Sequence, residues 1–79
     1  TTGIGVSNTA NNIHGIRCAL LSDLMSARLT RQHNDANMMA LGAGVVGEKL
    51  ALEMVDLFLT TPFEGGRHAR RVDKVMALE

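Results

Sequence analysis

The clearest periodic segment of the chain is 48–59, where apolar side chains recur at the spacing of one helix face. These side chains, at i, i+4, i+7 and i+8, are Leu50, Met54, Leu57 and Phe58. Such a stripe is typical of a helix that packs on a core. Pro62 follows the stripe and cannot continue a helix, because its ring fixes φ and removes the backbone donor. We therefore expect a helix over 48–59.

Two short apolar runs, at 16–21 and 38–41, have the length of buried strands. The second run has low β propensity, and its length and the glycines after it favour a strand over a helix. Between them, Ser22-Asp23 is a helix N-cap signal before 24–32, which is rich in helix-forming residues.

The remaining elements lie at the two ends of the chain. A segment with three asparagines, 6–13, predicts only a short helix, because Asn is a poor helix former. The last helix is expected over 66–78. Strands that alternate with helices indicate parallel pairing and the doubly wound α/β class. Two parallel strands are too few for an independent sheet, so we expect the missing strands to come from an upstream half or from a partner chain.

Composition excludes several classes of function. The 79 residues carry eight basic and eight acidic side chains and only two aromatic residues, both Phe. Zero net charge and the lack of a base-stacking platform argue against a nucleic-acid partner, and no apolar run approaches the length of a membrane span. Cys18, the single cysteine, cannot form an internal disulfide and fits a cytoplasmic protein. The five methionines are expected to fill the core. They are Met25, Met38, Met39, Met54 and Met76.

Arginines gather where the last helix is expected to begin. The positive end of a helix dipole disfavours each Arg there by a few tenths to about 1 kcal/mol, so a bound anion would explain the cluster. Arg67 and Arg71 are four residues apart, share one helix face and could fork onto one phosphate. The alternative is a solvated basic helix start. Arg70 lies off this line and is expected in solvent, as is His14 beside Gly15.

Three motifs occur in one order along the chain: Thr2-Gly3-Ile4-Gly5, the run 31–37 (Arg-Gln-His-Asn-Asp-Ala-Asn), and the run 63–68 (Phe-Glu-Gly-Gly-Arg-His). Together they resemble the C-terminal half of the sugar-phosphate isomerase family that contains ribose-5-phosphate isomerase B and galactose-6-phosphate isomerase. The resemblance extends over all 79 residues.

The resemblance implies that 1–79 is the C-terminal part of a single sugar-phosphate isomerase domain. Its fold would be half of a doubly wound, Rossmann-like parallel-sheet sandwich, with a C-terminal helix that packs on a partner subunit in a homodimer or higher homo-oligomer. The implied activity is aldose–ketose isomerisation of a phosphorylated sugar through an enediolate. Ribose 5-phosphate is the preferred substrate, and galactose 6-phosphate and allose 6-phosphate remain open. No metal or organic cofactor is implied.

In that family the glycine loop holds the developing oxyanion with backbone amides. Gly3 and Gly5 match this loop, and both are expected to use their freedom for φ > 0 and close approach to substrate. Thr2 is expected to add a hydroxyl contact and is carried over as a catalytic residue.

The other implied site residues follow later in the chain. His33 matches the histidine that opens the sugar ring as acid or base, and Asn34 is expected to orient a substrate hydroxyl. Without the resemblance, the favoured interpretation of His33 is a cation at a helix C-terminus. Arg67 and Arg71 match the arginines that bind the phosphate across a dimer interface. His68 is expected to touch phosphate or to cap the preceding turn, and its spacing from His33 supports no metal site.

One departure from the family limits the activity expected of this segment. Many members carry a cysteine two residues before the loop threonine as the base for proton transfer, and this position precedes Thr1. Thr1 itself stands where the family usually has glycine, and Cys18 is too far along a strand to replace the base. We therefore expect negligible isomerase activity from the 79 residues alone. The alternative function is a non-catalytic phosphosugar-binding or interaction subunit.

Overall fold

The fold is given by a computed structural model that describes residues 1–79. Its elements are α1 (Ile4–Asn11), β1 (Cys18–Leu20), α2 (Leu24–Gln32), β2 (Met38–Ala40), α3 (Glu48–Thr60) and α4 (Arg67–Met76). Their order and type confirm the sequence-based prediction. The strands and α4 are shorter than expected, and α1 begins two residues earlier.

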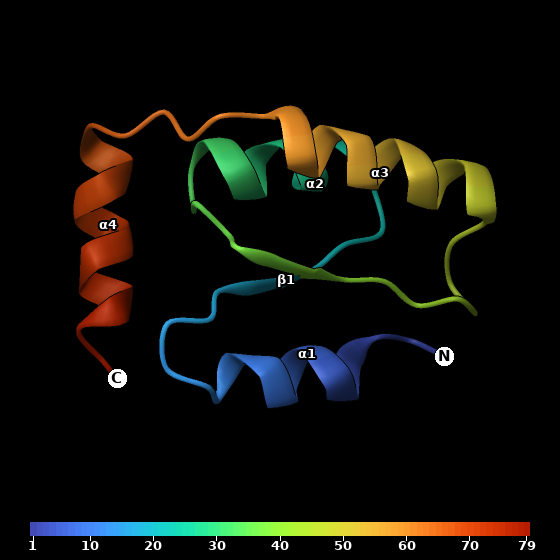
Figure 1. The fold of residues 1–79 in the computed structure, drawn as a ribbon, viewed down its shortest axis with the longest axis horizontal. Helices are drawn as coiled ribbons and strands as arrows, with labels where there is room; N and C mark the ends of the chain where they lie inside the picture. Colours follow the sequence, from blue (N-terminus) through green and yellow to red (C-terminus); the bar gives the residue numbers. More distant parts are fainter.

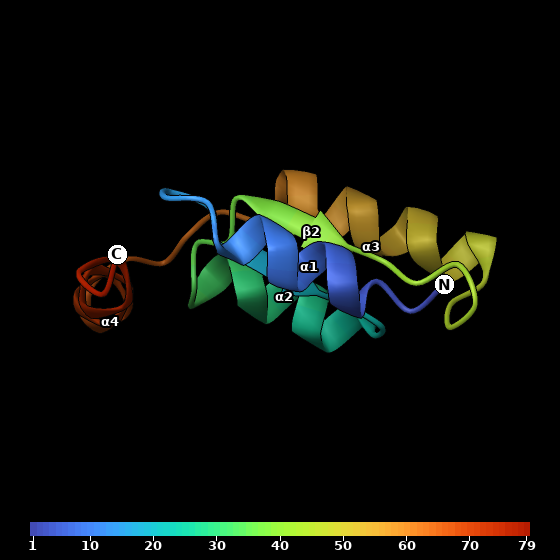
Figure 2. The same ribbon diagram turned by 90° about the horizontal axis from the view of Figure 1, so that it is seen from below.

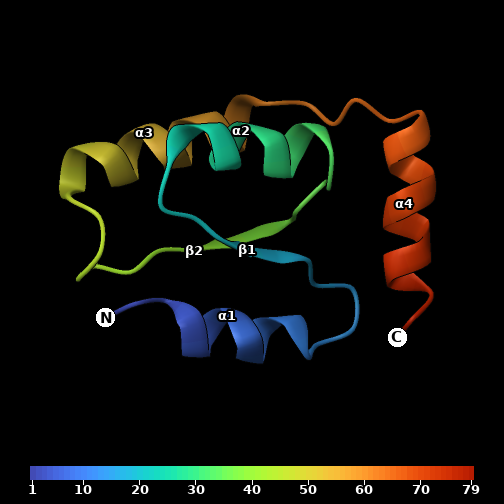
Figure 3. The ribbon, with the colours of Figure 1, turned by 180° about the vertical axis from the view of Figure 1, so that it is seen from behind.

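The two strands form a parallel sheet between two layers of helices. Cys18 pairs with Met38 and Leu20 with Ala40, so both strands run in one direction and α2 is the crossover between them. Helix α1 covers one face of the sheet, and α2 and α3 lie together on the other (Figure 1). The view from behind shows the same order of layers (Figure 3). This confirms the α/β class and the small parallel sheet.

The core lies between the sheet and the α2–α3 layer. Leu21, Ala27 and Met54 are its buried members, and Met54 is the largest fully buried side chain. The predicted stripe of α3 packs here, because its other three members lie against this cluster. The expectation for the methionines is wrong at two positions: Met25 is 63% exposed and Met38 is 40% exposed.

The starts of the helices depend on local chemistry. Asp23 caps α2 as predicted: its carboxylate accepts a hydrogen bond from the Ser26 amide at 2.7 Å. This amide, and then the Ser26 hydroxyl, lower the pKa of Asp23. Gly3 caps α1 with φ +81°, a left-handed conformation that glycine adopts without strain. The expectation of positive φ at Gly5 is wrong, because Gly5 lies inside the first turn of α1.

Helix α4 stands apart from the layered unit. Figure 2 shows it nearly end-on, beyond the ends of the other helices. Val72 is buried, but Val75 is 56% exposed and Leu78, just after the helix, is 87% exposed. None of the four helices has both the length and the apolar composition that crossing a bilayer requires.

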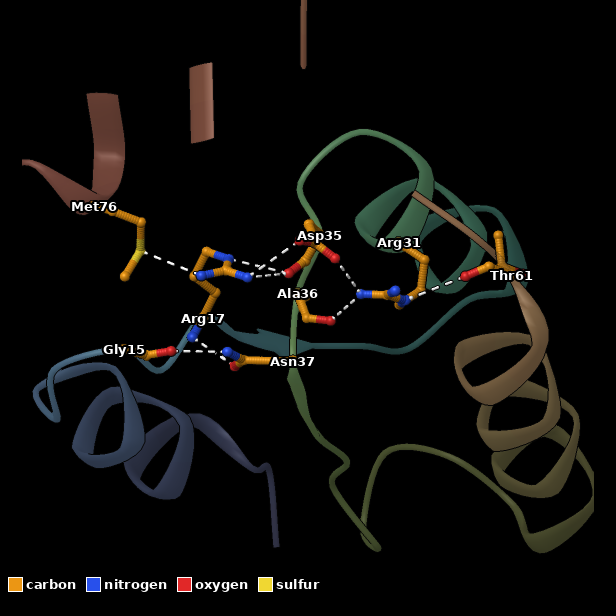
Figure 4. Close-up of polar contacts among 8 residues, drawn as sticks. All are labelled: Gly15, Arg17, Arg31, Asp35, Ala36, Asn37, Thr61 and Met76. Atoms are coloured by element: carbon orange, nitrogen blue, oxygen red, sulfur yellow. Dashed lines mark hydrogen bonds and ion pairs between the residues drawn. The ribbon is translucent and has the colours of Figure 1, made fainter. Parts of the chain in front are cut away.

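The turn between α2 and β2 is held by Asp35, which lies between two arginines (Figure 4). Arg31 approaches one carboxylate oxygen at 2.9 Å, and Arg17 approaches the other at 3.5 Å while donating to the Asp35 carbonyl at 2.7 and 3.0 Å. Asp35 has φ +48°, a left-handed conformation that Asp and Asn tolerate better than most residues. The two guanidinium groups thus fix a turn whose backbone alone would be unfavourable.

The same arginines connect this turn to the segment that leads into α4. Arg31 donates to the carbonyl of Ala36 and, at 3.3 Å, to that of Thr61 (Figure 4). The Glu64 amide donates to the Gln32 carbonyl at 3.0 Å. The end of α2 and the loop before α4 are therefore tied together by hydrogen bonds to backbone carbonyls.

We expect Met54→Ala to lower the free energy of unfolding by about 2–5 kcal/mol, since it leaves a cavity in the core. Met25→Ala is the matched control and should stay within about 0.5 kcal/mol, because its side chain is exposed. Urea unfolding of both variants measures the difference. Equal midpoints would contradict this description of the core.

We expect Asp35→Ala to lower the free energy of unfolding by about 1–2 kcal/mol, because both arginines lose a charged acceptor and Ala tolerates positive φ less well. Asp35→Asn keeps the tolerance of positive φ and should lower the free energy of unfolding by less. Hydrogen exchange at the Ala36 amide, which donates to Thr30, should accelerate most in Asp35→Ala. Unchanged protection in both variants would show that Asp35 does not hold the turn.

Candidate functional site

The residues identified from the sequence lie at two opposite ends of the sheet. Gly3 is packed where the strands finish: a Cβ built on it would lie 2.7 Å from Leu20 Cδ1 and 3.0 Å from the Leu41 carbonyl carbon. His33 and Asn34 lie in the turn before β2 begins. Figure 1 shows the start of α1 at one end of the layers and the α2–β2 turn and α4 at the other. The site residues therefore form two groups, one at the start of α1 and one at the α2–β2 turn and α4. The members of each group lie near one another, but the two groups are far apart.

The first group, at the start of α1, offers backbone amide donors that are not used within the chain. The Thr2 hydroxyl accepts a hydrogen bond from the Ile4 amide at 3.2 Å, and the Ser7 amide donates to the Gly3 carbonyl at 3.0 Å. The amides of Gly5 and Val6 make no hydrogen bond within the chain. They lie in the first turn of α1, where the peptide dipoles favour negative charge. Gly5 is exposed, and a side chain on it would meet nothing within 4 Å.

The second group is built around two stacked imidazoles. His33 is the C-cap of α2, and His68 lies in the first turn of α4. Their ring centroids are 4.2 Å apart and their planes differ by 9°. Glu64 is close to both rings: its Oε1 lies 3.7 Å from Nε2 of His33 and 3.5 Å from Nε2 of His68. These three side chains are called the His33–Glu64–His68 cluster below.

His68 is the buried member of the cluster. Its side chain is 10% exposed, compared with 39% for His33. Desolvation lowers the pKa of His68, and the positive charges of His33, Arg67 and Arg71 lower it further, while Glu64 acts in the opposite direction. His68 is therefore held in its neutral form around pH 7.

Sequence reasoning missed this role for His68 and missed Glu64 altogether. His68 stacks on His33, so the expectation that it caps the preceding turn is wrong. The only available signal was the i, i+4 spacing of Glu64 and His68, which places them near each other but says nothing of His33. The approach of His33 depends on the chain path between α2 and α4.

The His33–Glu64–His68 cluster holds three metal-type ligand atoms within 4.8 Å of one another. Its geometry is not that of a formed metal centre. An imidazole binds a metal along a lone pair in its ring plane, and two face-to-face rings within 9° of parallel hold these lone pairs in two separate, nearly parallel planes. One ion cannot lie on both axes in this arrangement, although His and Glu are common ligands of zinc.

The arginines of the last helix lie beside this group. Arg67 begins α4 and Arg71 follows one turn later; both are exposed and neither forms an ion pair within the chain. Arg71 and Asn34 both line an open groove of about 670 Å³ between α4 and the sheet, and Arg67 lies outside it. Arg70 is exposed, as predicted.

Cys18 lies in β1, as expected, and burial raises the pKa of its thiol. A thiol whose ionisation is disfavoured is a poor base, and this one lies in the sheet between the two groups. No other cysteine is present in the 79 residues.

Residues 1–75 match the model of the family described as Ribose/Galactose Isomerase. The chain is 49% identical over 78 residues to ribose-5-phosphate isomerase B of Escherichia coli, covering 99% of this chain and 52% of the relative. Among solved structures, ribose-5-phosphate isomerase B of Clostridium thermocellum has a TM-score of 0.95 at 51% identity, over 98% of this chain and 52% of that one.

A further structure, the Mycoplasma genitalium ribose-5-phosphate isomerase B with bound ribulose 5-phosphate, has a TM-score of 0.94 at 42% identity. The match covers 98% of this chain and 51% of that one. The chain thus spans about half the length of the relatives it matches. A family match over nearly all of its residues, with the same fold at this identity, leads to one conclusion: the chain belongs to the Ribose/Galactose Isomerase family.

Proposed function

We propose that this chain is the C-terminal half of an aldose–ketose isomerase that converts ribose 5-phosphate to ribulose 5-phosphate. The observation that carries this proposal is that the family match at 1–75 includes both groups of site residues, from Thr2 to Arg71. The relative with bound ribulose 5-phosphate supports the choice of sugar. The family also includes galactose isomerases by its description, so galactose 6-phosphate is the second candidate substrate.

The imidazole end suits the opening of the sugar ring. Opening a furanose breaks the bond between C1 and the ring oxygen and moves one proton from the anomeric hydroxyl to that oxygen. Protonated His33 gives a proton to the ring oxygen and takes back the proton of the anomeric hydroxyl, so no proton is lost overall. Asn34, exposed beside it, orients a substrate hydroxyl, and Arg67 and Arg71 bind the phosphate.

The amide end suits the isomerisation step. A base takes the proton from C2, and the resulting enediolate carries its negative charge on the C1 oxygen. The proton of the C2 hydroxyl then moves to the C1 oxygen, and the base returns its proton to C1, which leaves the carbonyl at C2. The free amides at the start of α1 can stabilise this charge, with the Thr2 hydroxyl beside them. The base belongs to the upstream part of the protein, since Cys18 is unsuited to this role.

The separation of the two groups implies that each site uses two copies of the chain. From Asn37 to Leu41 the chain advances about 13 Å along the strand direction, and one group of site residues lies beyond each end of this segment. A small sugar phosphate cannot reach both ends of one copy. In a homodimer with two-fold symmetry, the amide end of one copy meets the imidazole and arginine end of its partner. The exposed Val75 and Leu78 give α4 an apolar surface for that contact.

We expect the isolated 79 residues to show negligible turnover of ribose 5-phosphate. A chimera that places the unmatched half of the E. coli relative before Thr1 should turn it over. In this chimera, Arg67→Ala and Arg71→Ala should each raise KM about 10-fold or more by weakening phosphate binding, and Arg70→Ala is the matched control. A folded chimera that binds the sugar phosphate without turnover supports the non-catalytic alternative. Turnover of galactose 6-phosphate but not of ribose 5-phosphate would assign the second candidate substrate instead.

The shared site can be tested by mixing two inactive variants of the chimera. Gly5→Pro removes one amide donor in a helical turn that tolerates proline, and should lower kcat about 10²–10³-fold. His33→Gln removes the acid–base group. Mixed dimers carry one intact site of two, so co-refolded variants should recover about a quarter of the native activity. No recovery would place both groups in one subunit's site.

A further inference from the structure

The His33–Glu64–His68 cluster contains two residues to which the proposed function gives no role. Glu64 lies in the loop before α4 and His68 in the first turn of α4, yet both approach a histidine at the end of α2. Each contact is specific: a ring stack at 4.2 Å and two nitrogen–oxygen approaches of 3.5 and 3.7 Å.

We propose that Glu64 and His68 are positioning residues for His33, which fix the plane of its imidazole and select the nitrogen that faces the substrate. This inference rests on the proposed function, because it assigns His33 to the sugar ring. Neither Glu64 nor His68 needs to touch the substrate for this role.

The stack determines the plane of the His33 ring. His33 is 39% exposed, and its side chain makes no hydrogen bond within the chain, so little else restricts its rotation. His68 is buried at the start of α4, and it offers one flat face to the exposed ring of His33. An acid–base group that rotates freely is in position only part of the time, so this restriction favours proton transfer.

The carboxylate selects the nitrogen. Oε1 of Glu64 faces Nε2 of His33 at 3.7 Å, which favours a hydrogen on Nε2 and leaves Nδ1 without a partner in the chain. A carboxylate beside one ring nitrogen commonly sets which nitrogen of a histidine does the chemistry. Nδ1 of His33 is then the atom that exchanges protons with the sugar.

The charges around His68 disfavour a proton on it. Glu64 raises the pKa of His68, whereas burial and the charges of His33, Arg67 and Arg71 lower it. Because its burial and these positive neighbours lower the pKa of His68, this ring stays neutral, and the pair avoids two stacked cations.

The loop that carries Glu64 is shaped for this contact. Gly65 and Gly66 both have positive φ, +72° and +58°, in open surroundings. Two successive left-handed residues turn the chain back so that His68 returns over His33, and only glycine adopts both without strain. The hydrogen bond from the Glu64 amide to Gln32 fixes the loop against the end of α2.

The test uses the chimera described above. Glu64→Gln and His68→Ala should lower kcat about 10- to 100-fold with KM changed less than about 3-fold, since the phosphate contacts remain. His68→Phe keeps a flat stacking ring and should recover most of the loss seen in His68→Ala. Nitrogen-15 NMR should show the hydrogen of neutral His33 on Nε2 in the native chimera and a shift toward Nδ1 in Glu64→Gln. His14→Gln is the matched control.

Unchanged kcat in both Glu64→Gln and His68→Ala would overturn the inference, as would a rise in KM alone. An unchanged nitrogen-15 pattern of His33 in Glu64→Gln would overturn the part assigned to the carboxylate. If the native chimera lacks activity, the proposed function fails, and the NMR readout still decides whether the two neighbours orient His33. Glu64 is half exposed, so its substitution leaves the fold intact even if His68→Ala does not.

Discussion

The parallel pairing of β1 and β2 is the constraint on which the rest of the structure depends. Because both strands run in one direction, every segment that follows a strand lies at one end of the sheet and every segment that precedes one lies at the other. The start of α1 is packed against the finishing end, and the α2–β2 turn lies at the starting end. The two groups of site residues therefore lie at opposite ends of the sheet, and the two-chain site proposed above rests on this separation.

The end of the sheet where the strands begin is held by charged hydrogen bonds, whereas the middle of the fold is held by apolar packing. Asp35 accepts from two arginines, and Arg31 extends the contact to the segment before α4. A small core centred on Met54 cannot order a turn at the edge of the sheet, so hydrogen bonds from guanidinium groups to carbonyls do so. His33 lies at this ordered edge, two residues before Asp35.

Several surfaces of the chain are apolar. Large apolar side chains are exposed on α1 and α4 as well as on the sheet, among them Val6, Leu20 and Val75. A chain of 79 residues that buries so few large side chains gains limited stability from its own core. In the function proposed above, an upstream half beside the sheet and a second copy against α4 would cover these surfaces.

The sequence by itself determined the type and order of the elements, since the stripe of α3, the Asp23 cap and the length of the apolar runs are local properties. It also placed Arg67 and Arg71 at the start of the last helix, and its motifs indicated the family. It could not place His68 or Glu64 against His33, nor show that Gly5 lies within a helix. Those features depend on the path of the loop through Gly65 and Gly66 and on where α1 begins. Only the tertiary structure decided that the two groups of site residues lie at opposite ends, because strand direction and packing, rather than spacing along the chain, fix the distance between them.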